Sequence, residues 1–426
     1  MSEATEPAQS DVSAKSPSAI SKKAGFFVLG TVFIDAMGIG IIIPVTPDLV
    51  SELGGIPLSE AALWAGYLSF SFATMQFLFA PIIGNLSDRF GRRPILISSL
   101  AMLAIDYMIM AAASALWVLF VGRLLAGVFS ATHSTANAYM ADIYPQGERA
   151  KAFGLIGAAF GLGFVVGPVI GGIAGEFGTR VPFIAAAILA GANAIYGYLV
   201  VPETLKPENR RSFSLARANP LGTIRQLGKF PSLTWIFLAL LIFNIAHHVY
   251  PAIWSFYTKV AFGWSNIDIG VSLALVGIGF AIVQGALIRP MIDRFGEIKT
   301  VYIGLFLNII AMTGLGVATE SWMVYALMPF SALGMLAPPA LHAILANRAG
   351  DDSQGEMQGA ISAVQGITII ASPILMTQLF SHFTSDDAPI FMPGMPFLGA
   401  AALAAVAFIP LFIGIAASSK EMDANR

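Results

Sequence analysis

The chain has no cysteine and very few charged residues. Asp, Glu, Lys and Arg make up 11 % of its 426 residues, against about 25 % in an average soluble domain. So few charges do not cover a water-exposed surface, which excludes a soluble globular enzyme of this size. The absence of cysteine excludes disulfides, thiolate metal sites and cysteine nucleophiles. A net charge of −2 gives no reason to expect nucleic acid as a partner.

The apolar residues gather in runs long enough to cross a bilayer, which takes about 20 residues. The runs are continuous, unlike the alternating strands of a membrane barrel. The sequence therefore predicts an all-α polytopic membrane protein with 12 transmembrane helices, whose solvent is the lipid bilayer. The expected helices cover residues 25–46, 61–84, 95–113, 116–140, 151–174, 182–202, 233–257, 268–291, 299–318, 321–346, 356–380 and 396–418.

The positions of Lys and Arg predict the orientation. Of the 23 basic residues, all except Arg123, Arg180 and Lys259 fall in the termini and in the loops on the same side. We expect that side, with both termini, to be cytoplasmic. Residues 1–24 are polar and rich in Ser and Pro, so they predict a disordered cytoplasmic tail.

A polar, basic segment at residues 203–232 divides the chain into two six-helix bundles, at 25–202 and 233–418, followed by a short cytoplasmic tail at 419–426. The sequence Asp-Arg-Phe-Gly at Asp88 recurs at Asp293, and the same shift of 205 residues relates Pro168 to Pro373. This repeat predicts two pseudo-symmetric bundles with a substrate site between them, as in alternating-access transporters.

The loop after the second predicted helix carries a signature, G-N-L-S-D-R-F-G-R-R, which contains Gly84, Asp88, Arg89, Gly91, Arg92 and Arg93. A basic cytoplasmic turn alone explains the arginines but not the Gly and Asp positions. The signature resembles that of the major facilitator superfamily. The resemblance implies that this motif is a cytoplasmic gate, in which Asp88 meets the N-terminus of a helix in the other half. The alternative is a local pair with Arg89 or Arg92.

The N-terminal half is also similar to the tetracycline/proton antiporters of the drug-efflux branch. The similarity includes Asp35-Ala-Met-Gly, Asp106-Tyr107 and Gly122-Arg123-Leu-Leu-Ala-Gly127. The C-terminal half departs from that family. Phe280 replaces an expected histidine, Asn308 an aspartate found in several members, and His342 a glutamine.

Three charges lie deep inside predicted helices, namely Asp35, Asp106 and Arg123. At 1.5 Å per residue they are about 15 to 20 Å from the cytoplasmic ends. A charge at this depth is costly and therefore marks a functional site. We expect Asp35 and Asp106 to exchange protons under the influence of Arg123. The alternative is a permanent Asp106–Arg123 ion pair that only fixes helix packing.

Polar side chains inside the predicted helices are candidates for a substrate cavity between the two halves. In the second half, which has no deep carboxylate, His248 and His342 are also the candidate proton carriers, although each histidine fits an interhelical hydrogen bond. No His/Glu cluster has metal-ligand spacing, so we expect no metal site. The cavity candidates are Gln76, His133, Asn137, Asn244, His248, Gln284 and His342.

The fifth predicted helix is rich in glycine. Its small-xxx-small spacing predicts close helix packing, and the stretch resembles the glycine-proline motif of drug antiporters, which implies export. The two explanations are compatible. The motif residues are Gly163, Gly167, Pro168, Gly171 and Gly172.

The sequence thus predicts a secondary active transporter, a proton-coupled antiporter that exports an amphipathic, tetracycline-like small molecule by alternating access. The alternatives are a proton-coupled symporter for a metabolite and a non-transporting membrane receptor. We expect no enzymatic activity, no catalytic residue and no cofactor other than the coupling proton. We also expect a monomer in the plasma membrane, here the bacterial inner membrane.

Overall fold

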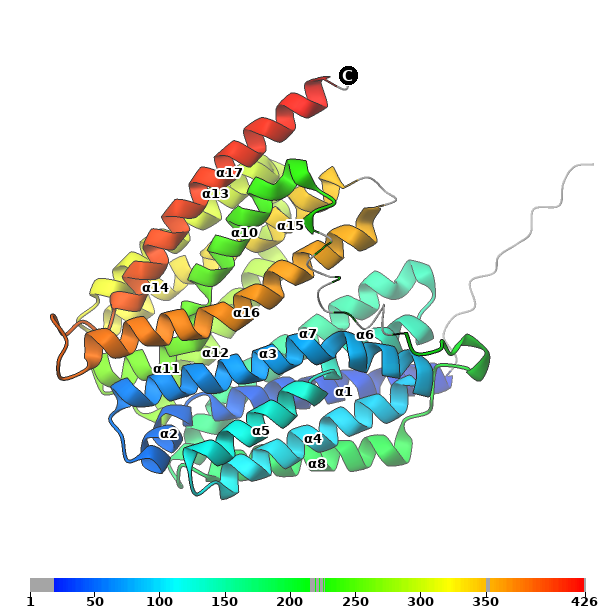
Figure 1. The fold of residues 1–426 in the computed structure, drawn as a ribbon, viewed down its shortest axis with the longest axis horizontal. Coiled ribbons are helices and arrows are strands. Elements are labelled where there is room, and N and C mark those ends of the chain that lie inside the picture. Colours follow the sequence, from blue (N-terminus) through cyan, green and yellow to red (C-terminus); the bar gives the residue numbers. More distant parts are fainter. Residues whose placement is uncertain are drawn as a thin grey trace, which may run out of the picture.

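A computed structural model describes residues 19–214, 227–349 and 353–424, together with Asn219, Gly222 and Arg225 from the linker. The described residues form helices, turns and loops without a strand, so the all-α prediction is confirmed. The helices make two bundles that meet at one end of the molecule (Figure 1).

The first bundle contains eight α-helices and one short 3₁₀-helix. They are α1 (Ala19–Ile42), α2 (Thr46–Gly54), α3 (Leu58–Phe90), α4 (Arg92–Ala112), α5 (Leu116–Phe129), α6 (Thr132–Ile143), η1 (Gln146–Glu148), α7 (Arg149–Gly175) and α8 (Val181–Val200).

The linker and the second bundle follow. Their described elements are η2 (Pro207–Asn209), η3 (Pro231–Leu233), α10 (Thr234–His247), α11 (Val249–Phe262), α12 (Asn266–Ile282), the π-helical turn η4 (Val283–Leu287), α13 (Ile288–Val317), α14 (Ser321–Gly334), α15 (Ala337–Arg348), α16 (Gln354–Thr384) and α17 (Met395–Ala424).

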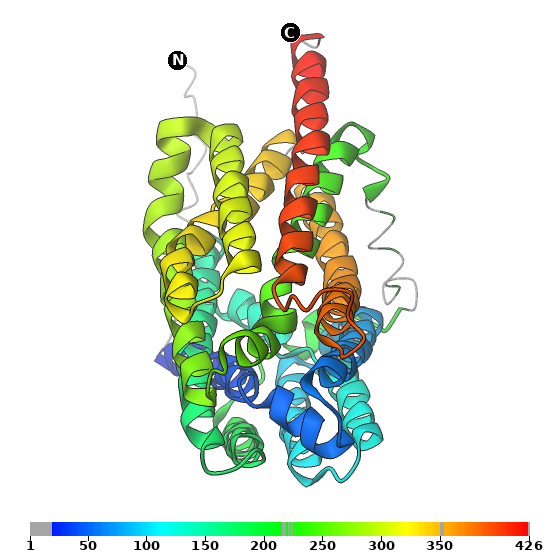
Figure 2. The same ribbon diagram turned by 90° about the vertical axis from the view of Figure 1, so that its left-hand side faces the viewer.

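Eleven segments of the described chain are long and apolar enough to cross a membrane. One of them, Asn266–Val317, has 52 residues, about twice the length that a bilayer accommodates. It includes two predicted spans, 268–291 and 299–318, and its helical conformation is interrupted at Gly296. The chain turns back there, as the two neighbouring columns of α12 and α13 show (Figure 2). The eleven segments therefore contain the twelve predicted spans.

The internal repeat is visible in where helices break. Helix α1 ends at Ile42 and α10 at His247, which are 205 residues apart. The break between α5 and α6, after Phe129, recurs between α14 and α15, after Gly334, at the same offset. The sequence predicts continuous helices at 25–46, 116–140, 233–257 and 321–346, and each of these spans is instead interrupted. Broken helices in transporters expose backbone groups near the bilayer midplane.

The two bundles contact each other through the pairs α7–α12 and α3–α16. A Cβ atom at Gly277 would lie 2.6 Å from Val165, and one at Gly366 would lie 2.7 Å from Phe77. Toward the other end of α7, a Cβ at Gly157 or Gly161 would meet nothing within 4 Å. The bundles therefore touch over only part of their length.

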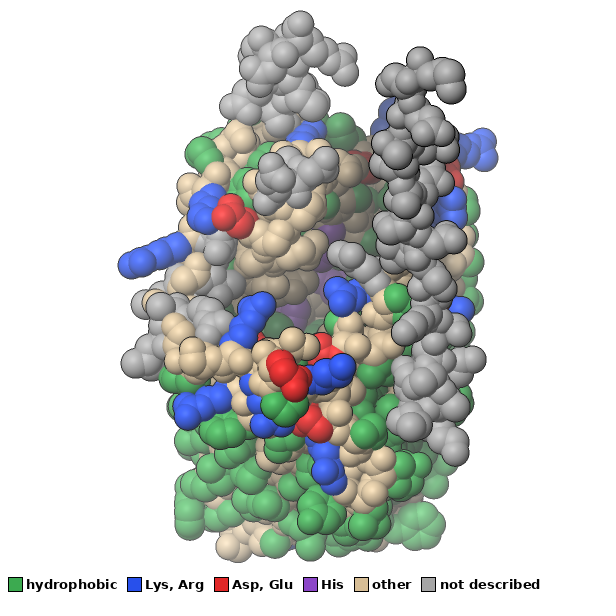
Figure 3. All heavy atoms as spheres, turned by 90° about the vertical axis from the view of Figure 1, so that its right-hand side faces the viewer, with side chains coloured by type: hydrophobic (Ala, Val, Ile, Leu, Met, Phe, Trp, Pro, Cys, Tyr) green, Lys and Arg blue, Asp and Glu red, His purple; other side chains and the backbone are tan. Residues whose placement is uncertain are grey.

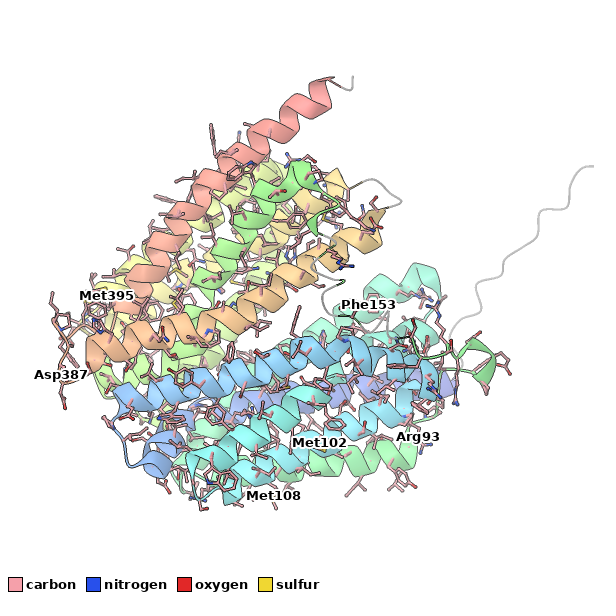
Figure 4. The ribbon with its side chains drawn as sticks, viewed as in Figure 1. Arg93, Met102, Met108, Phe153, Asp387 and Met395 are labelled. Atoms are coloured by element: carbon pink, nitrogen blue, oxygen red, sulfur yellow. The ribbon has the colours of Figure 1, made fainter. Side chains whose placement is uncertain are left out.

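We call the end with residues 84–93, 203–214 and 289–299 the linker end, and the opposite end the closed end. Figure 4 shows Arg93 at the linker end, with Asp387 and Met395 at the closed end. Viewed from the linker end, the surface is hollowed between the bundles, and histidine side chains are visible in its depth (Figure 3). At the closed end, Lys259 Nζ donates to Asp48 Oδ2 across the two halves at 2.8 Å.

The termini depart in part from the predicted boundaries. Helix α1 begins at Ala19, inside the segment predicted to be a disordered tail, and residues 1–18 lie outside the described chain. Helix α17 continues to Ala424, although its candidate span ends at Ala417.

Candidate functional site

Helices α4 and α5 carry an ion pair inside the first bundle. Arg123 Nη2 contacts Asp106 Oδ2, and the Asp106 side chain is 1 % exposed. The pair fits because α5 has a glycine at its side: a Cβ on Gly122 would lie 2.9 Å from Asp106 Oδ1. The Arg123 guanidinium also lies over the ring of Phe72, 5.5 Å from its centre. Pairing with a carboxylate and an aromatic face makes this buried cation tolerable.

Asp35, the third deep charge, lies on α1 in a half-buried position. Within the described part of the chain its carboxylate makes no hydrogen bond and no ion pair with another side chain. Of the three deep charges, two are therefore paired with each other and one is unpaired. An unpaired carboxylate at this depth is able to bind a proton without first breaking an ion pair.

The signature loop forms an ionic network on the first bundle. Arg92 contacts Asp88 at 2.5 Å and Asp142 of α6 at 3.3 Å. The local pair of Asp88 with Arg92, the alternative raised by the sequence, is therefore present. The predicted contact of Asp88 with a helix of the other bundle is not formed among the described residues in this conformation, because the two bundles are separated at the linker end (Figure 1). The gate stays a prediction for the conformation in which that end is closed.

Sequence reasoning missed Glu203, which completes this network. Its two carboxylate oxygens accept from the backbone N–H groups of Arg92 and Arg93, at 2.9 and 3.2 Å. A carboxylate at the first turn of a helix satisfies free N–H groups and interacts favourably with the helix dipole. A signal existed, because Glu203 is the first acidic residue after the sixth predicted span.

The second bundle repeats this loop with altered charges. Arg89 lies over Phe90 and Arg294 over Phe295, with separations of 5.1 and 5.4 Å. In place of the Arg92–Asp142 ion pair, Asn347 Nδ2 donates to Glu297 Oε1 at 2.6 Å, each partner shifted by 205 residues. The corresponding positions therefore contact each other in both halves, and in the second half one of the two partners is a neutral amide.

The glycine-proline stretch of α7 lies where three helices meet. A Cβ on Gly163 would be 2.9 Å from Met37 N, and one on Gly167 would be 3.0 Å from Gly40 Cα, so this face packs against α1. A Cβ on Gly172 would be 3.0 Å from Ile267 Cα of α12. The motif therefore brings α7 close to a neighbour in its own bundle and to a helix of the other bundle at once.

The candidate cavity residues of the first bundle lie at the α5–α6 break. Gln76 Nε2 donates to Ser130 Oγ at 2.8 Å. His133 is exposed, with its ring 5.8 Å from that of Phe160, and Asn137 Nδ2 donates to the His133 carbonyl at 3.1 Å.

The candidate cavity residues of the second bundle surround the α10–α11 and α14–α15 breaks. The Asn244 carbonyl interacts with His248 Nδ1 at 3.0 Å, and Gln284 Nε2, in the π-helical turn, donates to the Met335 carbonyl at 3.3 Å. His342 Nε2 is buried and has no hydrogen-bond partner among the residues that the structure describes.

His247 belongs to the same polar patch of the seventh predicted helix as Asn244 and His248. Its Nδ1 lies 3.2 Å from Asn308 Nδ2, and the Asn308 side chain is completely buried. The pair joins α10 to α13, so only the folded arrangement reveals it. Over the described residues, no group of three or more His, Asp or Glu side chains has a metal-binding arrangement.

Comparison with known proteins identifies the fold family. Residues 28–291 and 248–424 match the Major Facilitator Superfamily. The chain belongs to the major facilitator superfamily. It is 38 % identical over 365 residues to the class C tetracycline resistance protein of Escherichia coli, which covers 86 % of this chain and 91 % of the relative. It is 37 % identical over 367 residues to the class G protein of Vibrio anguillarum, covering 84 % and 91 %.

Solved structures of transporters have the same superfamily fold. A bacterial homologue of the human lysosomal transporter Spinster, in an inward-facing and unoccupied conformation, aligns with a TM-score of 0.78 at 14 % identity over 95 % of this chain and 99 % of that one. The human organic anion transporter MFSD10 aligns with a TM-score of 0.68 at 21 % identity, covering 92 % and 99 %. The chain is therefore a multi-pass membrane protein of a transporter superfamily.

Proposed function

We propose that this protein is a proton-coupled antiporter that exports an amphipathic, tetracycline-like small molecule by alternating access. The observation that carries the proposal is the combination of a buried Asp106–Arg123 pair with an unpaired Asp35 in the same bundle. Charges at this depth are characteristic of ion pathways. Relatives that are 32 to 38 % identical are tetracycline resistance proteins, which supports drug efflux and antibiotic resistance as the role.

The linker end faces the cytoplasm in this proposal, together with both termini, and the membrane is the bacterial inner membrane. The concentration of Lys and Arg at this end supports the assignment. The hollow of Figure 3 is then the inward-facing cavity, and the Lys259–Asp48 pair closes the outer face. Substrate enters the cavity from the cytoplasm while the outer face is shut.

Transport then couples substrate release to proton uptake. In the outward-facing state, substrate leaves and a proton binds at the carboxylates Asp35 and Asp106. The protonated carrier returns inward and releases the proton to the cytoplasm, where substrate binds again. Asp88 leaves its local pair with Arg92 and closes the inner face against the other bundle. The arginine at position 123 keeps Asp106 ionised until the conformation changes.

The candidate cavity residues of the two bundles bind the substrate, and the bilayer is the other partner. The protein acts as a monomer, because each bundle supplies one side of the cavity. The proposal includes no catalytic residue, no metal and no cofactor apart from the proton. It therefore includes no enzymatic activity.

Proteoliposomes with an acidic lumen test the direction and the coupling. An antiporter accumulates tetracycline in the lumen as protons leave, whereas a symporter moves the compound outward with the protons. Protein-free liposomes control for passive accumulation of a weak base. A panel of drugs and metabolites replaces tetracycline in parallel assays. If no compound in the panel moves in exchange for protons, the antiporter proposal is wrong.

A further inference from the structure

Tyr107, which follows Asp106 in α4, has a buried hydroxyl without a partner. The residue is 1 % exposed and is among the largest fully buried side chains. Its hydroxyl oxygen has no hydrogen bond to any described residue. Buried hydroxyl groups are nearly always paired, so an unpaired one calls for an explanation. On the outer side of the same helix, Met108 is exposed and points away from the bundle (Figure 4).

The hydroxyl is directed at α1, one turn from Asp35. A Cβ atom on Gly38 would lie 3.0 Å from the Tyr107 hydroxyl oxygen and 3.2 Å from its Cε2. Only a residue without a side chain allows the ring to approach α1 so closely. Asp35 and Gly38 are three residues apart and therefore share a face of the helix.

Few other charges face this point. The Asp106 carboxylate on α4 is paired with Arg123 of α5. The histidine of α6 is His133. Between Lys151 and Glu176, α7 has no titratable residue; on α8 the titratable residues are Tyr196 and Tyr198, near its linker end. Glu60 and Asp88 lie at opposite ends of α3. Among the described residues, Asp35 is therefore an unpaired carboxylate one helical turn from Gly38, which the unpaired Tyr107 hydroxyl approaches.

We propose that Tyr107 is a positioning residue for Asp35. Its hydroxyl donates a hydrogen bond to the ionised Asp35 carboxylate once the Asp35 side chain turns along α1 toward Gly38. Protonation of Asp35 removes the charge that holds this bond, so the hydroxyl is released. Tyr107 follows Asp106 directly in α4. A change in the protonation of Asp35 that moves Tyr107 therefore also affects the Asp106–Arg123 pair. This inference rests on the proposed proton coupling.

The Tyr107→Phe variant tests the proposal, since it removes one oxygen and keeps the ring. A hydrogen bond to the charged form of a carboxylate favours that form, so its loss makes Asp35 retain its proton to higher pH. Infrared difference spectroscopy of the purified protein follows the protonated carboxyl band during a pH titration, and the Asp35→Asn variant assigns that band. We expect the midpoint to rise by about one pH unit in Tyr107→Phe.

Two further variants separate this role from packing. Tyr139→Phe removes another buried hydroxyl of the same bundle, which donates to the Pro202 carbonyl at 2.8 Å, and leaves the Asp35 midpoint unchanged. Gly38→Ala keeps the Tyr107 hydroxyl but displaces it, and raises the midpoint. Thermal unfolding of Tyr107→Phe occurs at no lower temperature than that of the wild type, because the hydroxyl has no partner to lose in this conformation.

An unchanged Asp35 midpoint in both Tyr107→Phe and Gly38→Ala overturns the proposal. That outcome is distinct from failure of the proposed function, because the titration needs no substrate. Failure of the function appears instead as wild-type proteoliposomes that exchange no compound for protons, whatever the infrared midpoint of Asp35.

Discussion

Gly91 and Gly296 occupy corresponding positions in the two halves and share an unusual backbone conformation. Their φ angles are 113° and 75°, and their ψ angles are 161° and 165°. Residues with a side chain rarely adopt this region. The repeated glycine in the Asp-Arg-Phe-Gly sequence is thus explained by the turn that reverses the chain between two spans.

The surroundings of these glycines differ, which predicts unequal effects of substitution. A Cβ on Gly91 would collide with the Glu203 carboxylate, whereas one on Gly296 would meet nothing within 4 Å. Gly296→Ala adds only backbone strain, about 1–3 kcal/mol. Gly91→Ala adds the same strain and also displaces the Glu203 cap, for a total of about 2–4 kcal/mol. Chemical unfolding in detergent measures both, and equal losses would contradict this explanation.

Glu203 is predicted to stabilise the start of α4. Replacing Glu203 with Ala leaves the Arg92 and Arg93 N–H groups without their acceptor, and we expect a loss of about 1–2 kcal/mol in unfolding free energy. Glu208→Ala is the matched control, because Glu208 is exposed on the same segment and contacts no helix terminus. A loss of the same size in both variants would show that Glu203 acts only through the net charge of the linker.

The spans were predictable from the sequence because their hydropathy is high over about 20 residues each. The repeat was predictable because matching residues recur at a fixed offset. The mid-span breaks were not. The break after Phe129 falls at Ser130 and Ala131, where neither Pro nor Gly marks an interruption. Comparing both halves supplies a signal, since the corresponding break after Gly334 precedes Pro338 and Pro339.

The deep charges could be predicted individually, and the Asp106–Arg123 pair was one of the two alternatives that the sequence left open. The depth of Asp106 and Arg123 follows from their positions in two spans, whereas their contact depends on how α4 packs on α5. Two other contacts could not be predicted, namely that of Glu203 with the start of α4 and that of His247 with Asn308. Each joins residues that are more than 60 apart in the chain, so only tertiary packing specifies them.

Glycines at the contact between bundles are predicted to be essential for movement. Gly172→Ala places a methyl group against the backbone of α12, where overpacking costs about 1–3 kcal/mol, and reduces transport by about tenfold or more. Gly157→Ala on the same helix meets nothing within 4 Å and retains transport close to wild type. Initial rates in proteoliposomes compare the two at equal protein content. Equal rates would show that this contact does not limit transport.

The Lys259–Asp48 pair is predicted to hold the closed end shut. Lys259→Gln leaves Asp48 without its partner and favours the conformation that is open at this end, by about 3- to 10-fold in population for a partly buried pair worth about 1 kcal/mol. Distances between spin labels on α2 and α11 report that opening. Arg180→Gln is the control, because Arg180 lies 3.7 Å from Glu52 within one bundle and therefore leaves the distribution unchanged. An unaltered distance distribution in Lys259→Gln would show that this pair does not hold the closed end shut.

The Asp106–Arg123 pair tests the account most directly, because packing and proton coupling predict different behaviour of a double variant. Asp106→Asn alone leaves Arg123 buried without a partner, at a cost of about 3–5 kcal/mol, and abolishes transport. Adding Arg123→Gln removes the unpaired charge and restores stability.

The decisive measurement is tetracycline accumulation in acid-loaded proteoliposomes that contain the double variant, Asp106→Asn with Arg123→Gln. We expect a stable protein in which proton-driven accumulation remains at least tenfold below wild type, because the titratable group is absent. Wild-type accumulation by this stable double variant would contradict the account and leave the pair a purely structural contact.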